Sequence, residues 1–202
     1  MKRRQIKIVI ITFLTILILT NLPFLPGPNF LNGPAQLFFT IGQVVGMIGL
    51  LFVPIGIIWT AIINAKKQEL FRPLFFTAIF LAPLMSLLFL TKLSRDFSRN
   101  IAVKNGNKLV RQIENYKIKN GNYPDFLDNS IFYVPHSWII GVEHYNYRKT
   151  DSSFELEFNQ NVLFGFNFEI VTFNNKNEQK TQGEQKTLYP TSDKKWKYEI
   201  YD

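Results

Sequence analysis

The sequence contains no cysteine, which excludes disulfide bonds, thiolate catalysis and cysteine-based metal sites. Histidine is almost as scarce, because His136 and His144 are the only two, and their spacing assembles no set of three or four metal ligands. We expect structural roles for both, and no cofactor. The chain also lacks a Gly-x-Ser-x-Gly elbow, a phosphate-binding loop and a dinucleotide fingerprint. These absences predict a protein that is not an enzyme.

Acidic residues are nearly absent from the first 93 residues, where Glu69 is the only one. No charged residue occurs between Ile8 and Ala65, or between Pro73 and Thr91. Water does not accommodate uncharged apolar runs of this length, so lipid is the expected solvent. The sequence therefore predicts a transmembrane anchor over residues 1–93 and a water-exposed domain over residues 94–202.

The net charge of +8 is unevenly distributed along the chain. From Ser94 onward, 15 basic residues face 14 acidic ones, so the excess of positive charge lies beside the apolar runs. That placement is typical of the positive-inside rule. Because no basic face interleaved with aromatic residues is left over, nucleic acid is not expected as a partner.

Three membrane spans are predicted, at about Ile6–Phe24, Ala35–Ile63 and Pro73–Leu90. The first span has an alternative interpretation, because basic residues ahead of an apolar run also begin a signal peptide. No small-x-small cleavage site follows, which favours an uncleaved helix. Apart from Lys7 at the start of the first span, the spans contain no ionisable residue, which disfavours a pump or a transporter. The predicted fold class is thus a membrane-anchored α+β protein, in which three transmembrane helices precede a helix packed on a small antiparallel sheet.

Glycines recur along the second predicted span. Gly42, Gly46 and Gly49 lie on or near one helical face, and Gly42-xxx-Gly46 is the spacing that lets two helices approach closely. A generic glycine-rich membrane helix is an equally good interpretation. Pro54 is expected to kink this helix, since it removes a backbone donor.

Basic residues set the expected topology. They flank the first apolar run and fill the turn between the second and third spans, at Lys66, Lys67 and Arg72. The rule places both regions in the cytoplasm, so three crossings put the C-terminal domain outside. The localisation expected is a cell membrane of the bacterial inner-membrane type, with several spans.

A helix is predicted at about Asn107–Asn120, and its start is open because it can continue back through Gly106. Leu109, Ile113 and Tyr116 form an apolar stripe of helical period. Lysines in the last turn interact favourably with the free carbonyl groups at the C-terminus of a helix. Gly121 suits the left-handed conformation that often ends a helix. The basic residues of this region have two interpretations, a solvated face or contact with anionic headgroups. The candidates for headgroup contact are Arg95, Arg99, Lys104 and Lys108.

Further on, the apolar period changes from helical to alternating. Residues 154–159, 164–171 and 196–200 alternate apolar with polar positions, which is typical of antiparallel strands with one buried face. Residues 131–134 and 138–147 are weaker strand candidates. Residues 174–186 are expected to form a long polar loop.

The stretch Tyr116-Lys-Ile-Lys-Asn-Gly-Asn-Tyr-Pro124 lies between the predicted helix and the predicted sheet. This order resembles type IV pilins and type II secretion pseudopilins. The resemblance implies a domain whose helix packs on the sheet, with Gly121, Tyr123 and Pro124 at the exit of the helix. The processing glycine and early glutamate of pilins have no counterpart at Phe71-Arg-Pro-Leu-Phe75, so filament assembly is not implied.

Two classes of function follow from these patterns. The first is a non-enzymatic membrane protein that presents an α+β domain to bind or scaffold an envelope partner. The alternative is a small structural or regulatory subunit of a membrane complex, assembled through its transmembrane helices. The partners expected are the lipid bilayer and another envelope or membrane protein.

Overall fold

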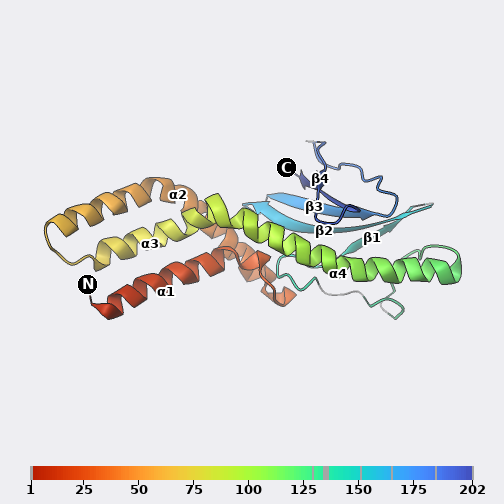
Figure 1. The fold of residues 1–202 in the computed structure, drawn as a ribbon, viewed down its shortest axis with the longest axis horizontal. Helices are drawn as coiled ribbons and strands as arrows, with labels where there is room; N and C mark the ends of the chain where they lie inside the picture. Colours follow the sequence, from red (N-terminus) through yellow and green to blue (C-terminus); the bar gives the residue numbers. More distant parts are fainter. Residues whose placement is uncertain are drawn as a thin grey trace. The chain divides into compact units, whose positions relative to one another are not determined.

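The computed structural model describes residues 2–128, 130–133, 137–150, 152–164, 166–184 and 186–201. The chain is an α+β protein with long helices and one five-stranded antiparallel sheet (Figure 1). It divides into two compact units. The apolar unit comprises Met1–Leu22 and Gly33–Ser94, and the polar unit comprises Pro23–Asn32 and Arg95–Asp202. The short segment Pro23–Asn32 therefore packs with the C-terminal residues. The predicted division into residues 1–93 and 94–202 assigns this segment to the N-terminal anchor instead.

Three helices build the apolar unit: α1 (Arg3–Thr20), α2 (Asn32–Ala65) and α3 (Phe71–Met85). A π-helical turn, Ser86–Leu90, follows α3 and leads directly into α4 (Thr91–Asn120). The first helix ends earlier than the predicted Phe24, because Pro23 has no amide hydrogen with which to continue it. Residues 22–24 and 29–31 form short 3₁₀ turns instead.

Among the described residues, two helical stretches are long and apolar enough to cross a membrane, Asn29–Ala65 and Phe71–Asn120. The sequence predicts three, but α1 does not qualify, because its 18 residues include three basic ones. Only 22% of the most apolar window of the first stretch is buried, whereas the core helix of a water-soluble protein is mostly buried. Large apolar side chains are exposed along α2: Leu37, Phe38, Ile41, Val44, Met47, Ile48, Leu50, Leu51, Ile55, Ile57, Ile58, Trp59 and Ile62.

The polar unit packs α4 against the sheet. The strands are β1 (Asn146–Lys149), β2 (Phe154–Leu163), β3 (Asn167–Asn174), β4 (Tyr189–Pro190) and β5 (Trp196–Tyr201). Their order in the sheet is β1-β2-β3-β5-β4, and each neighbouring pair is antiparallel. Buried apolar residues from α4, from the loops and from three strands form one core: Ala102, Val103, Leu109, Ile113, Tyr123, Phe132, Ile139, Val142, Tyr145, Phe154, Leu156, Phe158, Val171, Phe173 and Trp196.

The helix of the polar unit starts well before Asn107, since α4 begins at Thr91. Leu109 and Ile113 are fully buried, and Tyr116 is half-buried against the same core. Gly121 has a φ of +81°, in the left-handed region that favours glycine, and its amide donates to the Lys117 carbonyl. Tyr123 and Pro124 then lie buried.

The strands differ from the sequence prediction at one boundary and at the weak candidates. The strand predicted at 164–171 begins at Asn167, because Phe164 takes a left-handed φ of 49° in the preceding turn. Residues 131–133 form no strand, and of residues 138–147 only the last two enter β1, while Ile139 forms an isolated bridge with Pro26. Val134, His136 and Gly165 lie outside the described residues.

The alternation over residues 164–171 predicts that the apolar Phe168 and Ile170 of β3 face the core. This prediction is wrong. Glu169, Val171 and Phe173 share the face that is turned toward α4, because Val171 and Phe173 belong to the core and side chains alternate along a strand. Phe168 and Ile170 lie on the opposite face. Ile170 is nevertheless buried, since the loop after β3 folds back over that face. The backbone amides of Gln182 and Gly183 donate to the Glu199 carboxylate at 2.7 and 3.1 Å.

Gly106 is the point of closest approach between α4 and the aromatic core. A Cβ atom there would lie 2.9 Å from two ring carbons of Trp196 and 3.1 Å from Tyr145. Alanine normally stabilises a helix by about 1 kcal/mol relative to glycine. We expect Gly106→Ala to lower the free energy of unfolding instead, by about 1–3 kcal/mol, because the rings must move. Urea unfolding followed by tryptophan fluorescence measures this. Trp196→Phe removes the two contacted carbons, so in that background Gly106→Ala should cost less.

Candidate functional site

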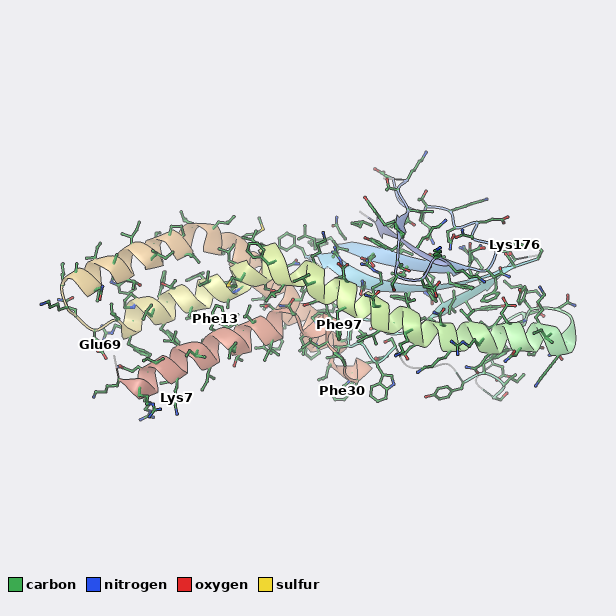
Figure 2. The ribbon with its side chains drawn as sticks, viewed as in Figure 1. Lys7, Phe13, Phe30, Glu69, Phe97 and Lys176 are labelled. Carbon is green, nitrogen blue, oxygen red and sulfur yellow. The ribbon has the colours of Figure 1, made fainter. Side chains whose placement is uncertain are left out.

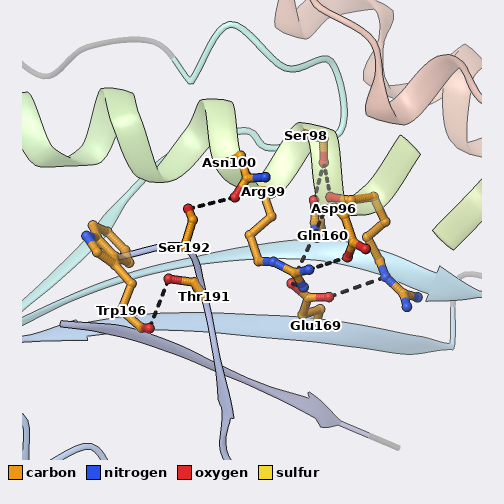
Figure 3. A network of polar contacts seen from close by, with 10 residues as sticks. Asp96, Ser98, Arg99, Asn100, Gln160, Glu169, Thr191, Ser192 and Trp196 are labelled. Atoms are coloured by element: carbon orange, nitrogen blue, oxygen red, sulfur yellow. Dashed lines mark hydrogen bonds and ion pairs between the residues drawn. The ribbon is translucent and has the colours of Figure 1, made fainter. Parts of the chain in front are cut away.

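A charged network is buried between α4 and the sheet. Glu169 of β3 is fully buried, and the Arg99 Nη1 atom donates to its Oε1 atom at 2.7 Å (Figure 3). The Arg95 Nε atom lies 3.3 Å from Glu169 Oε2 on the other side. The Gln160 amide donates to Oε1 at 3.0 Å, so three side chains surround one carboxylate. We refer to Arg95, Arg99, Gln160 and Glu169 as the arginine–glutamate network.

The surroundings of the network hold the arginines in place. The Arg99 guanidinium also binds Asp96 of its own helix and lies 3.9 Å above the ring of Tyr198. Ser98 donates to the Gln160 side chain. Burial raises the pKa of the Glu169 carboxyl, and the positive charges of Arg99 and Arg95 act in the opposite direction.

This arrangement serves packing better than catalysis. The side chain of Glu169 has no exposed surface, and its partners come from the domain itself. A carboxylate that acts on a substrate must come within hydrogen-bond reach of it. The network instead fixes α4 on the sheet, because a buried charge that loses its partner is very costly.

The arginine–glutamate network involves two of the four residues that the sequence suggests for contact with lipid headgroups. Arg99 is buried and engaged with Glu169, and Arg95 is directed at the same carboxylate, so neither side chain is free to reach a lipid surface. Lys104 and Lys108 are exposed on α4. Lys108 donates to Asn105 at 2.8 Å. Alternation does not predict the network, because it assigns Glu169 to the solvent-facing side of the strand, whereas the residue is fully buried.

The glycines of α2 contact other helices of the same chain. A Cβ atom at Gly46 would lie 2.8 Å from the Pro83 carbonyl oxygen, and one at Gly49 would lie 2.8 Å from that of Phe80. At Gly42 the added atom would clash with the Thr20 side chain of α1. The small-residue face is therefore occupied within the apolar unit, and it offers no surface to a second subunit.

The two ends of the apolar unit differ in charge. At one end Gln5 of α1 donates to Glu69, which lies in the turn between α2 and α3. Figure 2 labels Lys7 and Glu69 at this same end. At the other end the Asn21 amide donates to the Ser86 hydroxyl at 2.8 Å. One end therefore gathers seven of the eight basic residues of the unit, Lys2, Arg3, Arg4, Lys7, Lys66, Lys67 and Arg72, whereas Lys92 follows the π-helical turn.

The proline-rich segment Pro23–Asn32 is paired with a distant part of the polar unit. The amide of Gly141 donates to the Pro23 carbonyl at 2.7 Å, and the amide of Gly27 donates to the Trp138 carbonyl at 3.1 Å. Asn29 donates to the Glu143 backbone carbonyl at 2.7 Å. Trp138 itself takes a left-handed φ of 59°, and its side chain is 62% exposed.

Two tyrosines of the polar unit donate to backbone carbonyls, Tyr145 from a buried position and Tyr147 from a half-buried one. The hydroxyl of Tyr145 donates to the Ala102 carbonyl at 2.6 Å, and that of Tyr147 to the Pro124 carbonyl at 2.6 Å. Burial raises the pKa of Tyr145 far above its usual range. Burial and the nearby Asp125 carboxylate raise the pKa of Tyr147 to about 12.

These raised pKa values predict a loss of stability in alkali. A folded state that holds the proton more tightly than the unfolded chain is fully stabilised below the unfolded pKa of about 10 and loses that stabilisation above it. The urea midpoint should therefore fall as the pH rises from about 10 toward 12. Tyr145→Phe should flatten this dependence, whereas Tyr133→Phe, which removes an exposed hydroxyl, should leave it unchanged.

Within the described residues, no three His, Asp or Glu side chains lie close enough together to hold a metal ion. His144 is exposed, and His136 lies outside those residues. Comparison of the chain with protein-family models, with curated proteins and with solved structures gives no match.

Proposed function

We propose that the chain is a non-enzymatic integral membrane protein whose apolar unit anchors the polar unit at the membrane surface, where the polar unit binds an envelope partner. The observation that carries this proposal is the exposed apolar surface of α2. A continuous helix with this many large exposed apolar side chains is stable where lipid replaces water. The second apolar stretch, Phe71–Asn120, supports the same conclusion.

We propose three crossings, with α1 as the first. Its 18 residues span about 27 Å, close to the thickness of a hydrocarbon core. The contacts of Gln5 with Glu69 and of Asn21 with Ser86 support this, because α1 then extends along α3 from one end to the other. Its basic residues lie in the first turns, where long side chains reach the headgroups.

The charge of the apolar unit supports the orientation of the protein. Basic residues gather at the end that contains the N-terminus and the α2–α3 turn, which the positive-inside rule places in the cytoplasm. An odd number of crossings then puts the polar unit outside. The membrane that fits this charge pattern is a cell membrane of the bacterial inner-membrane type.

Exposed apolar residues between Ile118 and Tyr133 are the proposed binding surface for the partner. Ile118, Phe126, Ile131 and Tyr133 are all largely exposed. Large exposed apolar side chains of this kind mark interaction surfaces more often than ordinary surface. We keep the pilin resemblance as a proposal about domain shape, supported by the packing of α4 on an antiparallel sheet.

Reporter fusions test the proposed topology. A phosphatase that is active only outside the cytoplasm should be active when fused after Asp202. The matched control is the same phosphatase inserted after Lys67, which should be inactive. The reverse pattern would contradict the orientation, and activity at both positions would contradict the three crossings.

The alternative of a subunit assembled through its glycines is not adopted, because Gly42, Gly46 and Gly49 contact α1 and α3 of the same chain.

A further inference from the structure

The geometry points to a second membrane contact, in which Phe30 and Trp138 of the polar unit insert their aromatic rings into the headgroup layer. This inference rests on the proposed function, since it requires α1 and α2 to cross the bilayer. It adds to that function a surface by which the domain itself meets the lipid.

The first step is covalent connection. Pro23–Asn32 joins the end of α1 to the start of α2. Because α1 is only about 27 Å long, its end reaches no further than the boundary of the hydrocarbon. Pro23 follows Thr20 by three residues, which is at most about 11 Å of chain. The segment therefore begins within about 11 Å of the hydrocarbon boundary, in reach of the headgroup layer.

The second step is the pairing that brings Trp138 to this segment. The Trp138 carbonyl accepts the Gly27 amide, and Ile139 forms a bridge with Pro26. An open hollow of about 170 Å³ is lined by Gly27, Pro28, Asn29 and Trp138. Phe30, which Figure 2 labels, is 80% exposed in the same segment.

The third step is the cost of the observed conformation. A left-handed φ at a bulky residue such as Trp138 is unfavourable. The side chain is largely exposed, so packing within the domain does not offset that cost. Burial of the indole in the headgroup layer would offset it, because tryptophan favours the membrane–water interface.

The chemistry of this surface is apolar and aromatic. The Glu143 carboxylate accepts a hydrogen bond from the Asn32 side chain, and the Glu143 backbone carbonyl accepts one from Asn29. Electrostatic attraction to anionic lipid therefore does not hold the surface of Phe30 and Trp138 at the membrane. We expect the contact to form equally in zwitterionic vesicles and to persist at high salt.

Tryptophan quenching in vesicles tests the inference. The full-length protein with Trp59→Phe is reconstituted into phosphatidylcholine vesicles, which leaves Trp138 and Trp196, and Trp196 is fully buried in the core. Lipids carrying a nitroxide near the headgroup should quench the emission. Adding Trp138→Phe should reduce the quenched fraction by at least about two-fold, since the exposed indole is gone. The remaining Trp196 emission reports that the domain is folded.

A matched variant and the parent protein separate the outcomes. Lys119 is exposed in the last turn of α4, about 40 Å along this helix from Thr91. In the double variant, Lys119→Trp should be quenched by aqueous iodide and not by the lipid. If Trp138 behaves like this control, or if the control behaves like Trp138, the inference is wrong. If Trp59 of the parent protein is not quenched by lipid at any depth, the proposed function fails as well.

Discussion

Replacing Glu169 with leucine should destabilise the polar unit by about 3–5 kcal/mol, the cost of leaving a buried charge unpaired. Arg99 would lose the carboxylate 2.7 Å away, and Arg95 would lose the one at 3.3 Å. Arg99 is buried and would keep Asp96 as its charged partner, while the half-buried Arg95 would lose the carboxylate that it faces. Urea unfolding of the full-length protein in detergent, followed by the emission of the buried Trp196, measures this loss.

Two control variants test whether the loss of stability in Glu169→Leu is caused by the unpaired buried charge. Asp125→Leu removes a carboxylate that is 84% exposed and paired with Lys149, so it should cost no more than about 1 kcal/mol. The double variant Arg99→Leu/Glu169→Leu removes both charges and should recover most of the loss. A double variant as unstable as Glu169→Leu alone would show that packing, and not the ion pair, sets the stability.

Replacing Gly46 with leucine should open the packing of α2 on α3. The first added carbon alone would lie 2.8 Å from the Pro83 carbonyl oxygen and 3.3 Å from the Leu87 Cβ atom. Backbone atoms of a neighbouring helix cannot move aside like the end of a side chain, so we expect a loss of about 1–3 kcal/mol or more. The measurement is the midpoint of thermal unfolding of the purified protein in detergent.

Gly33→Leu is the matched control for this prediction. A Cβ atom at Gly33, at the start of the same helix, would meet nothing within 4 Å. The midpoint should therefore stay within error of the parent protein. A Gly46→Leu variant as stable as Gly33→Leu would mean that α2 and α3 are not packed as described.

The helices and most strands follow from local pattern. Uncharged runs predict α2 and α3, and the stripe of Leu109 and Ile113 predicts the buried face of α4, because periodicity is a local property of the sequence. The start of α4 was not predictable in the same way. Apolar and polar stretches are joined there without a helix-breaking residue, so the pattern does not mark where the helix begins.

The arrangement around the candidate sites depends on contacts between distant residues. Alternation assigns Phe168 and Ile170 of β3 to the core, but both faces of this central strand are covered, so alternation alone does not select the buried face. A buried Glu169 is stable because Arg99 of α4, 70 residues earlier in the sequence, donates a hydrogen bond to its carboxylate. The pairing of the proline-rich segment with residues 138–141 likewise has no local signature.

The most direct test of the central claim is extraction of the full-length protein from membranes. If lipid solvates the apolar unit, the chain stays in the pellet after washing with alkaline carbonate or high salt, and it becomes monodisperse only in detergent. Release into the carbonate supernatant as a monodisperse protein in plain buffer would contradict the account.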